Sequence, residues 1–487
     1  MSYLQLLKLA SPEAVVAVTA LVVLAIGLTS SRARLFCTLV AAIGLAAAIV
    51  AVLMLPQNAV LFSGMLVVSP LTSLFKIICI ALALFTVLLA AGDRASHNHG
   101  EYLAMLLLGT IGLMLLVGSE ELLMIFIGLE LTGLSLYVMA AFDKTDRSAE
   151  AGLKYFLFGS TASAFTLFGI SFVYGMSGTT GLVAIAHKIT TGPVQPLLAV
   201  GIVMTLVGFA FKIAAAPFHL WAPDAYQGAP VPSAAFIASG SKVASFVVLG
   251  KIVLVGFGPL HGSASWHALV AGWSPVLAVL AALSILIGNF VALAQTNVRR
   301  LLAYSAVAHA GYTLLGLVVG SRDGFSATLF YTIVYAVTLV GAFGVVAIVR
   351  NETGGDDFTN FAGLNARSPF LAGCMSIFML SLAGIPPLAG FFGKFYLFSA
   401  ALRPDANHGL LWLVAIALFG SLISLYYYLI VLKTIFVDER APSESRVSDS
   451  TGAYFLQKIV VTLLAFAVLL IGIFPTPLVE RILASLP

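Results

Sequence analysis

The feature that most constrains this chain is the recurrence of apolar runs about 20 residues long, the length that crosses a bilayer as one α-helix. Counting these runs along the 487 residues predicts fourteen membrane spans joined by short connections. The predicted spans lie near residues 12–30, 35–54, 68–91, 101–118, 120–142, 148–174, 197–221, 230–255, 273–295, 299–319, 324–350, 369–401, 408–436 and 454–474. We therefore expect an all-α polytopic membrane protein in which residues 1–487 form a single integral membrane domain.

Composition supports this class and excludes others. Hydrophobic residues make up 61% of the chain and charged residues only 9%, whereas a soluble globular chain carries about 25% charged residues. The alternating strands of a membrane barrel are absent from the pattern. Cys37, Cys79 and Cys374 fall within apolar runs at spacings that suit neither zinc nor an iron–sulfur cluster, so we interpret them as packing residues. No pattern indicates nucleic-acid binding, and we interpret the first apolar run as a span rather than a cleaved signal peptide.

Positive charge in the loops predicts the orientation, because cytoplasmic loops carry an excess of lysine and arginine. The odd-numbered loops hold twelve such residues, namely Arg32, Arg34, Arg94, Lys144, Arg147, Arg299, Arg300, Arg350, Arg367, Lys433, Arg440 and Arg446. The even-numbered side holds four, namely Lys188, Lys251, Arg322 and Arg403. We therefore expect the odd-numbered loops in the cytoplasm and both termini on the opposite, periplasmic side.

Two predicted spans contain helix-breaking residues. The seventh includes GFAFKIAAAPFHLW, in which Pro217 lacks the N–H that would bond the carbonyl of Ile213. The twelfth includes SLAGIPPLAGFFGKFYLF, with Pro386 and Pro387. Paired interruptions are typical of transporters built from two repeats, and repeats of five helices enter the membrane from opposite sides. The predicted organisation is three N-terminal helices, a first repeat, an inverted second repeat and a last helix, at residues 1–100, 101–255, 273–436 and 454–487.

Charged residues deep in the spans are rare, because a charge at the bilayer centre costs about 2.5–3.5 kcal/mol on insertion scales. Glu130 is the only one of the twenty acidic residues expected at such a depth. Lys76 lies nearer the end of its span, where a long side chain snorkels to the interface. Lys154 fits a structural or a functional interpretation equally, and His219 either relays protons or anchors its helix end. The residues interpreted as functional because of their depth are Lys212, Lys242, His309 and Lys394.

Glu130 and one of the deep lysines form the most economical charge pair in the sequence. At about 4 Å and an effective dielectric constant near 20, such a pair is worth roughly 4 kcal/mol. A nearby carboxylate stabilises the protonated lysine, and moving it away favours release of the proton. The broken helix beside Lys212 leaves free carbonyl groups that keep water close. The sequence therefore predicts a hydrated proton site that needs no metal or cofactor.

Four stretches resemble a known family. They are LKYFLFGSTASAFTLFGISFVYG, FKIAAAPFHLWAPDAYQGAP, NVRRLLAYSAVAHAGY and LAGIPPLAGFFGKFY. In this order they are similar to the antiporter-like membrane subunits of bacterial NADH–quinone oxidoreductase, respiratory complex I, and to the subunit N family in particular. The resemblance covers at least the fourth to the thirteenth predicted spans. It implies fourteen helices, two inverted five-helix repeats, discontinuous helices seven and twelve, and a location in the bacterial inner membrane.

The resemblance also implies roles for individual residues and partners. The residues it assigns to proton translocation are Glu130, Lys154, Lys212, Lys242, His309 and Lys394, with Glu130 and Lys212 as a pair. The chain would be a subunit of an enzyme without a redox site of its own. FMN, iron–sulfur clusters, NADH and quinone would be bound by other subunits. The expected partners are the lipid bilayer and other membrane subunits, including a second antiporter-like subunit and small membrane subunits.

Two other functions remain open at this point. The chain could belong to a multi-subunit cation/proton antiporter, which shares the fold and the line of charges; copurifying flavin and iron–sulfur proteins would separate the two. It could also be a structural membrane scaffold, which would tolerate loss of the buried charges.

Overall fold

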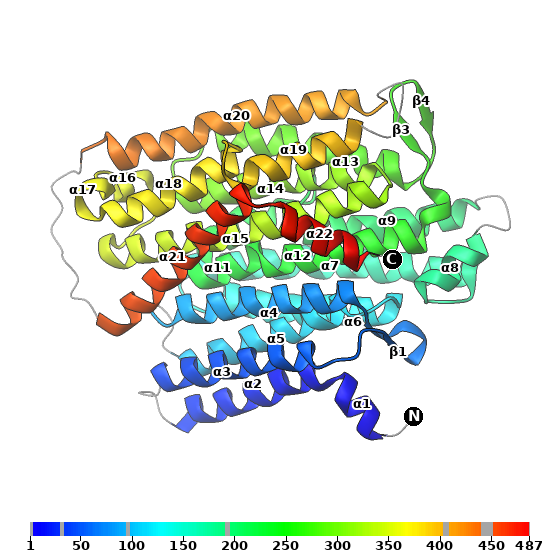
Figure 1. The fold of residues 1–487 in the computed structure, drawn as a ribbon, viewed down its shortest axis with the longest axis horizontal. Coiled ribbons are helices and arrows are strands. Elements are labelled where there is room, and N and C mark those ends of the chain that lie inside the picture. Colours follow the sequence, from blue (N-terminus) through cyan, green and yellow to red (C-terminus); the bar gives the residue numbers. More distant parts are fainter. Residues whose placement is uncertain are drawn as a thin grey trace.

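The computed structural model describes residues 3–29, 34–93, 98–189, 195–402, 409–439 and 451–486. Five of the basic loop residues used to predict the orientation lie outside these ranges, namely Arg32, Arg94, Arg403, Arg440 and Arg446. The described chain is a bundle of long, roughly parallel helices, with short hairpins at one end (Figure 1).

Among the described residues, twelve helices are long and apolar enough to cross a membrane, and each falls at a predicted span. One of them joins α11 (Val231–Ala238), α12 (Gly240–Lys251) and the π-helical turn η2 (Ile252–Gly256). The others are α2 (Ser11–Thr29), α3 (Arg34–Leu53), α4 (Pro70–Ala90), α5 (His99–Val117), α6 (Leu122–Ala140), α7 (Asp146–Ser177), α13 (Trp273–Ala292), α14 (Val298–Val318), α15 (Arg322–Thr353), α20 (Leu411–Phe436) and α21 (Thr451–Ile473).

The remaining two predicted spans are interrupted at the prolines. The seventh consists of α9 (Pro196–Lys212) and α10 (Trp221–Gly228), with Pro217 between them. The twelfth consists of α18 (Pro369–Ala383) and α19 (Ala389–Leu402), with Pro386 and Pro387 between them. The prediction of fourteen crossings counts each interrupted pair as one span.

The two ends of the bundle differ. The end that carries α1 (Tyr3–Leu9) and α22 (Thr476–Ser485) also carries α8 (Leu182–Ile189) and the hairpins β1 (Ala59–Leu61) with β2 (Leu66–Val68) and β3 (Ser263–Ser265) with β4 (Ala268–Val270) (Figure 1). We call it the terminal end. The other end carries α16 (Phe358–Phe361) and α17 (Leu364–Arg367), and we call it the loop end.

Local sequence explains where several helices begin. Ser69 and Thr72 form a reciprocal capping box at the start of α4, with Pro70 as its first residue. Thr145 and Ser148 do the same for α7. These caps satisfy N–H groups that have no partner within the helix. Backbone groups in a bilayer need such internal partners because lipid supplies none.

Small residues set how closely the helices approach each other. A Cβ on Gly208 of α9 would overlap the Thr166 hydroxyl of α7. A Cβ on Gly288 of α13 would overlap the backbone of Ala308 in α14. Such contacts between small residues are the usual basis of helix packing in membranes. The most enclosed long helices are α11–α12, α14 and α15, which form the centre of the bundle and carry part of the site.

Candidate functional site

Three of the predicted site residues lie in one line: Lys242 of α12, His309 of α14 and Lys394 of α19. Tyr335 and Tyr312 flank His309, with ring centroids 5.0 and 5.6 Å from that of the imidazole. The Lys242 Nζ lies 5.5 Å from the centre of the Tyr335 ring, and the Lys394 Nζ lies 5.1 Å from that of Tyr312. Aromatic faces attract cations at such distances. The line therefore runs from one lysine to the other through two tyrosines and the histidine.

Hydroxyl groups contact both ring nitrogens of His309. The Nδ1 lies 2.7 Å from the Tyr331 hydroxyl and the Nε2 lies 3.1 Å from the Tyr428 hydroxyl. Tyr428 in turn shares a hydrogen bond with Ser305, one turn earlier in α14. Because a hydroxyl can donate or accept, this environment accommodates either neutral tautomer and the protonated imidazole. His309 is buried, and the geometry allows it to gain or lose a proton without losing its partners.

The two lysines of the line are held by neutral oxygen atoms. Lys242 donates to the Ala306 carbonyl at 2.7 Å. Lys394 donates to the Ala383 carbonyl at 3.0 Å and to the Ser421 hydroxyl at 2.9 Å. Ala383 is the last residue of α18, so the ammonium lies at the partially negative end of a helix that the proline pair interrupts. Neither lysine forms an ion pair with a carboxylate of the described residues.

Lys212 and Glu130 are neighbours without a direct ion pair. Lys212 is the last residue of α9, and its ammonium donates to the Tyr137 hydroxyl at 3.3 Å. Glu130 accepts a hydrogen bond from Ser163 of α7. A Cβ on Gly133, one turn from Glu130, would lie 2.7 Å from the Lys212 Nζ, so both charges reach the same stretch of α6. In the described structure each charge contacts a hydroxyl group instead of the other charge.

Lys154 lies away from the line. Its Nζ contacts the carboxylates of Glu150 at 2.5 Å and Asp224 at 2.8 Å, and its side chain is 40% exposed. Arg300 holds the other oxygen of Asp224 at 2.7 Å. These contacts join α7, α10 and α14 at the loop end. The structure therefore places Lys154 in a partly exposed network of ion pairs and not with the lysines of the line.

His219 lies in the seventh-span interruption, close to the start of α10. Its ring centroid is 6.3 Å from that of Tyr304, and its Nδ1 has no hydrogen-bond partner among the described residues. In the same interruption, the Ala216 N–H donates to the Ser284 hydroxyl of α13 at 2.8 Å, just before Pro217. The interruption is therefore tied to the second half of the chain, and His219 is buried beside that tie.

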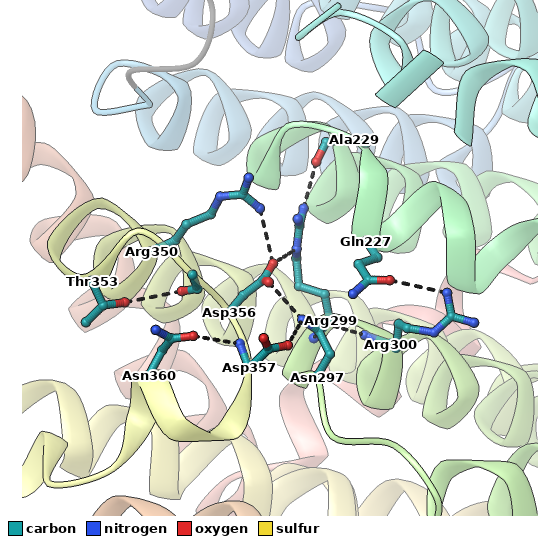
Figure 2. Close-up of polar contacts among 11 residues, drawn as sticks. Gln227, Ala229, Asn297, Arg299, Arg300, Arg350, Thr353, Asp356, Asp357 and Asn360 are labelled. Atoms are coloured by element: carbon teal, nitrogen blue, oxygen red, sulfur yellow. Dashed lines mark hydrogen bonds and ion pairs between the residues drawn. The ribbon is translucent and has the colours of Figure 1, made fainter. Parts of the chain in front are cut away.

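A second polar network joins the halves at the loop end (Figure 2). Arg299 is only 1% exposed, forms an ion pair with Asp356 and donates to the Ala229 carbonyl at 2.7 Å. Asn297 donates to the Asp356 carboxylate at 2.8 Å, and the Arg350 guanidinium lies 3.2 Å from the same carboxylate. Burial raises the pKa of the Asp356 carboxyl, but Arg299, Asn297 and Arg350 outweigh that effect, so its pKa lies below its ordinary value. The carboxylate is thus ionised at neutral pH.

Two buried charge pairs were not predicted. Lys76 is 1% exposed and lies 2.6 Å from Glu13 of α2, so the interpretation of Lys76 as a snorkelling residue is wrong. Lys251, one of the four basic residues assigned to the even-numbered side, is 3% exposed, donates to the Val117 carbonyl at 3.0 Å and lies 3.5 Å from Glu120. In both cases the acidic partner lies next to the start of another span. That position is the signal that could have revealed the pairs.

Ion pairing thus divides the six lysines described above into two groups. Those with a carboxylate partner are Lys76, Lys154 and Lys251. Those held only by neutral oxygen atoms or aromatic rings in the described part of the chain are Lys212, Lys242 and Lys394. Intramembrane cations without a partner charge are costly and mark ion or proton pathways. The purely structural interpretation accounts for the first group and leaves the second unexplained.

The fold is a helical membrane bundle interrupted in two spans, and beside each interruption lies a lysine that has no carboxylate partner among the described residues. These features define the class of antiporter-like membrane subunits. A family model described as NADH:quinone oxidoreductase/Mrp antiporter, TM, matches residues 119–424. NADH-quinone oxidoreductase subunit N 2 of Acidobacterium capsulatum is 44% identical, over 98% of this chain and 99% of the relative. Subunit N of Moorella thermoacetica is 39% identical, over 98% of both chains.

Solved structures agree with these relatives. A chain of respiratory complex I from Thermus thermophilus with bound aureothin superposes with a TM-score of 0.80 at 31% identity, over 97% of this chain and all of that one. A chain of the Mrp complex from Dietzia sp. has a TM-score of 0.83 at 22% identity, over 98% of this chain and 97% of that one, and it shows a shared fold. The chain belongs to the subunit N family of NADH-quinone oxidoreductase.

Proposed function

We propose that this chain is a proton-translocating membrane subunit of NADH:quinone oxidoreductase. Its path would run through Glu130 and Lys212 and then through the line Lys242, His309 and Lys394. The observation that carries the proposal is that all three lysines are buried and have no carboxylate partner in the described part of the chain. Each buried ammonium without a counter-charge is unfavourable in a membrane, so a structural role alone does not explain three of them in one chain.

The contacts suggest how protons are held along this path. An ammonium bound by carbonyl and hydroxyl oxygens loses no ion pair when it becomes a neutral amine. The Tyr137 hydroxyl accepts a hydrogen bond from the Lys212 ammonium, and the Ser163 hydroxyl donates one to the Glu130 carboxylate, so a neutral partner holds each charge. Movement of Glu130 toward or away from Lys212 would load or unload the lysine. The energy for that movement would come from redox chemistry in other subunits.

The packing supports two related groups of five helices, at residues 101–255 and 273–436. In the first group α5 packs on α6, α6 on α7, and α7 on α9. In the second group α13 packs on α14, α14 on α15, and α15 on both halves of the interrupted span, α18 and α19. The same order of contacts, together with one interruption in each group, favours a duplicated arrangement, and the odd number of helices in each copy would invert the second. Helices of residues 1–100 and 454–487 would complete the domain.

We further propose the surroundings of the subunit from the family to which it belongs. The loop end would face the bacterial cytoplasm and the terminal end the periplasm, in keeping with the distribution of arginine and lysine. FMN, iron–sulfur clusters, NADH and quinone would be bound by other subunits, leaving no redox site in this chain. Its neighbours in the membrane would be another antiporter-like subunit and small membrane subunits.

The test is proton pumping by inverted membrane vesicles that contain the assembled complex. We expect Lys212→Met and Lys242→Met to lower NADH-driven proton uptake at least tenfold while the amount of assembled complex stays above half. The matched control is Lys433→Met, which removes an exposed lysine at the loop end and should pump normally. Normal pumping by either buried-lysine variant would refute the path.

Copurification separates the proposal from a cation/proton antiporter subunit. A tagged chain purified in mild detergent should bring with it proteins that contain flavin and iron–sulfur clusters. A stable assembly without either group would favour the antiporter. The shared fold alone does not decide, because the Mrp chain superposes as well as the complex I chain.

A further inference from the structure

A group of charges at the terminal end plays no part in the path proposed above. Lys251 ends α12, and its ammonium donates to the Val117 carbonyl at 3.0 Å, with the Ser119 carbonyl at 3.5 Å. The carboxylate of Glu120 lies 3.5 Å away. Lys251 is almost fully enclosed, whereas one third of the Glu120 side chain is exposed. The pair therefore joins the interior of the bundle to its surface.

A second ion pair lies behind the same backbone segment. A Cβ on Gly118 would lie 2.8 Å from the Cε of Lys76 and 3.1 Å from its Nζ. Lys76 therefore lies against Gly118, next to Val117, whose carbonyl Lys251 binds. Lys76 lies 2.6 Å from Glu13. Apart from that contact, neither the ammonium nor the carboxylate has a hydrogen-bond partner among the described residues. Buried polar groups with so few protein partners are usually completed by water.

A cavity of about 490 Å³ gives Lys251 access to the surface. Its walls include Glu120, Lys251 and Ser321, and also Arg322, whose guanidinium donates to the carbonyls of Leu483 and Leu486 in the C-terminal segment. All the elements that line it reach the terminal end, where α22 and the β1–β2 hairpin lie (Figure 1). The cavity therefore belongs to that end of the bundle.

Lys251 and Lys242 are carried by the same helix. They are nine positions apart in α12, which corresponds to about 13–14 Å along the axis at 1.5 Å per residue. Ser245 is buried between them, one turn from Lys242. The helix thus connects the line of unpaired residues with the cavity, in the half of the chain that does not contain Lys394.

We propose that Lys251 and Glu120 form a proton-exchange site between Lys242 and the terminal face of the membrane. The ion pair of Lys76 and Glu13 is buried beside this site. The proposal rests on the proton translocation proposed above. An N–H bond of the Lys251 ammonium breaks as an O–H bond forms on Glu120, which leaves a neutral amine and a neutral acid. The acid then gives its proton to water in the cavity and becomes a carboxylate again. The amine regains a proton from the side of Lys242.

The site differs from a fixed ion pair in ways that can be measured. Among the described residues, the charged groups that face Lys251 are Glu120, Arg322 and Lys76, and Lys76 is itself paired with Glu13. Arginine keeps the positive charge and hydrogen bonds of lysine but does not lose a proton in proteins, while histidine titrates close to neutral pH. Substitutions at one position can therefore separate the need for a cation from the need for a titrating group.

The experiment compares Lys251→Met, Lys251→Arg and Lys251→His in assembled complexes, with Lys433→Met as the control. We expect the Met and Arg variants to lower NADH-driven proton uptake at least fivefold and the His variant to retain at least half of it. Normal pumping by the Met or the Arg variant would overturn the proposal, because a fixed cation or no cation would then suffice. A His variant as inactive as Met would also overturn it.

Two further measurements keep the outcome clear. Lys242→Met measured in parallel distinguishes the two proposals. If Lys242→Met loses proton uptake while the Lys251 variants pump normally, only the exchange site is rejected. If Lys242→Met pumps normally, the path itself is rejected. If a Lys251 variant does not assemble, Ser321→Cys decides, because Cys37, Cys79 and Cys374 are all buried. A membrane-impermeant maleimide should label it from the terminal side. Labelling only from the loop end, or none, would overturn the proposal.

Discussion

Replacement of Asp356 by alanine should destabilise the protein more than any other single change in the loop-end network. Asp356 lies between α15 and α16 and receives hydrogen bonds from Arg299, Asn297 and Arg350 (Figure 2). Its removal leaves the guanidinium of Arg299 almost fully buried without a counter-charge. We predict that this uncompensated charge dominates the effect.

The magnitude follows from the exposure of the two arginines. Breaking a buried pair by removing one partner costs about 3–5 kcal/mol, and Arg299 keeps only its bond to the Ala229 carbonyl. The contact with Arg350, whose side chain is 38% exposed, adds about 1 kcal/mol at most. We therefore expect Asp356→Ala to lower the free energy of unfolding by about 3–5 kcal/mol.

A double-mutant cycle isolates the cause. In Arg299→Met with Asp356→Ala no buried charge remains, so the double variant should recover about 2–3 kcal/mol relative to the sum of the single changes. The assay is the apparent melting temperature of the chain in mild detergent together with the amount of assembled complex. At about 2.1 cal/mol/K per residue, the single Asp356 variant should melt at least about 3 °C lower.

The matched control is Asp357→Ala, which removes a neighbouring exposed carboxylate that caps α16 and accepts one bond from Asn297. Loss of a cap costs about 1 kcal/mol. The reasoning would be refuted if the Asp356 and Asp357 variants were equally stable, or if the double variant were destabilised by the full sum of the two single changes.

Three other predictions concern Asp356, Lys394 and Gly208. The contribution of Asp356 to the free energy of unfolding is present above its unfolded pKa of about 3.9 and is lost as pH falls through its lower folded pKa. The wild-type protein should therefore lose this stabilisation only below about pH 4. In melting experiments Asp356→Asn should lack that acid-dependent loss. Lys394→Ala should reduce proton uptake at least tenfold while more than half of the complex assembles, and collapse of assembly alone would favour a structural role. Gly208→Ala should cost about 1–3 kcal/mol in unfolding experiments because its Cβ overlaps Thr166, whereas Gly175→Ala, which meets nothing within 4 Å, should be neutral or slightly stabilising.

The sequence predicts the spans and their interruptions because both depend on local chemistry. The run length follows from bilayer thickness, and Pro217, Pro386 and Pro387 fall in the interior of their apolar runs, where proline breaks a helix. The depth of Lys212, Lys242 and Lys394 is also local information. Their selection as site residues stays a prediction, and the structure supplies the neighbours on which the proposal depends.

The partners of charged residues depend on the fold and could not be predicted in the same way. Glu13 reaches Lys76 from another helix, and Asp224 reaches Lys154 although 70 positions separate them. The sequence predicts Arg299 as an ordinary loop residue, whereas its side chain is buried within the protein. Tyrosines are too common in membrane helices to mark a path, so Tyr312 and Tyr335 became candidates only when their rings were found beside His309.

The environment of His309 differs on its two sides, and the difference locates a control point in the proposed path. On the side of Lys394 the hydroxyl of Tyr312 accepts a hydrogen bond from Asn289 at 3.0 Å. On the side of Lys242 the hydroxyl of Tyr335 is buried and has no hydrogen-bond partner among the described residues. An unpartnered buried hydroxyl is costly and is expected where a group changes partners during function. In the proposed path, transfer between Lys242 and His309 would therefore require a temporary partner for the Tyr335 hydroxyl.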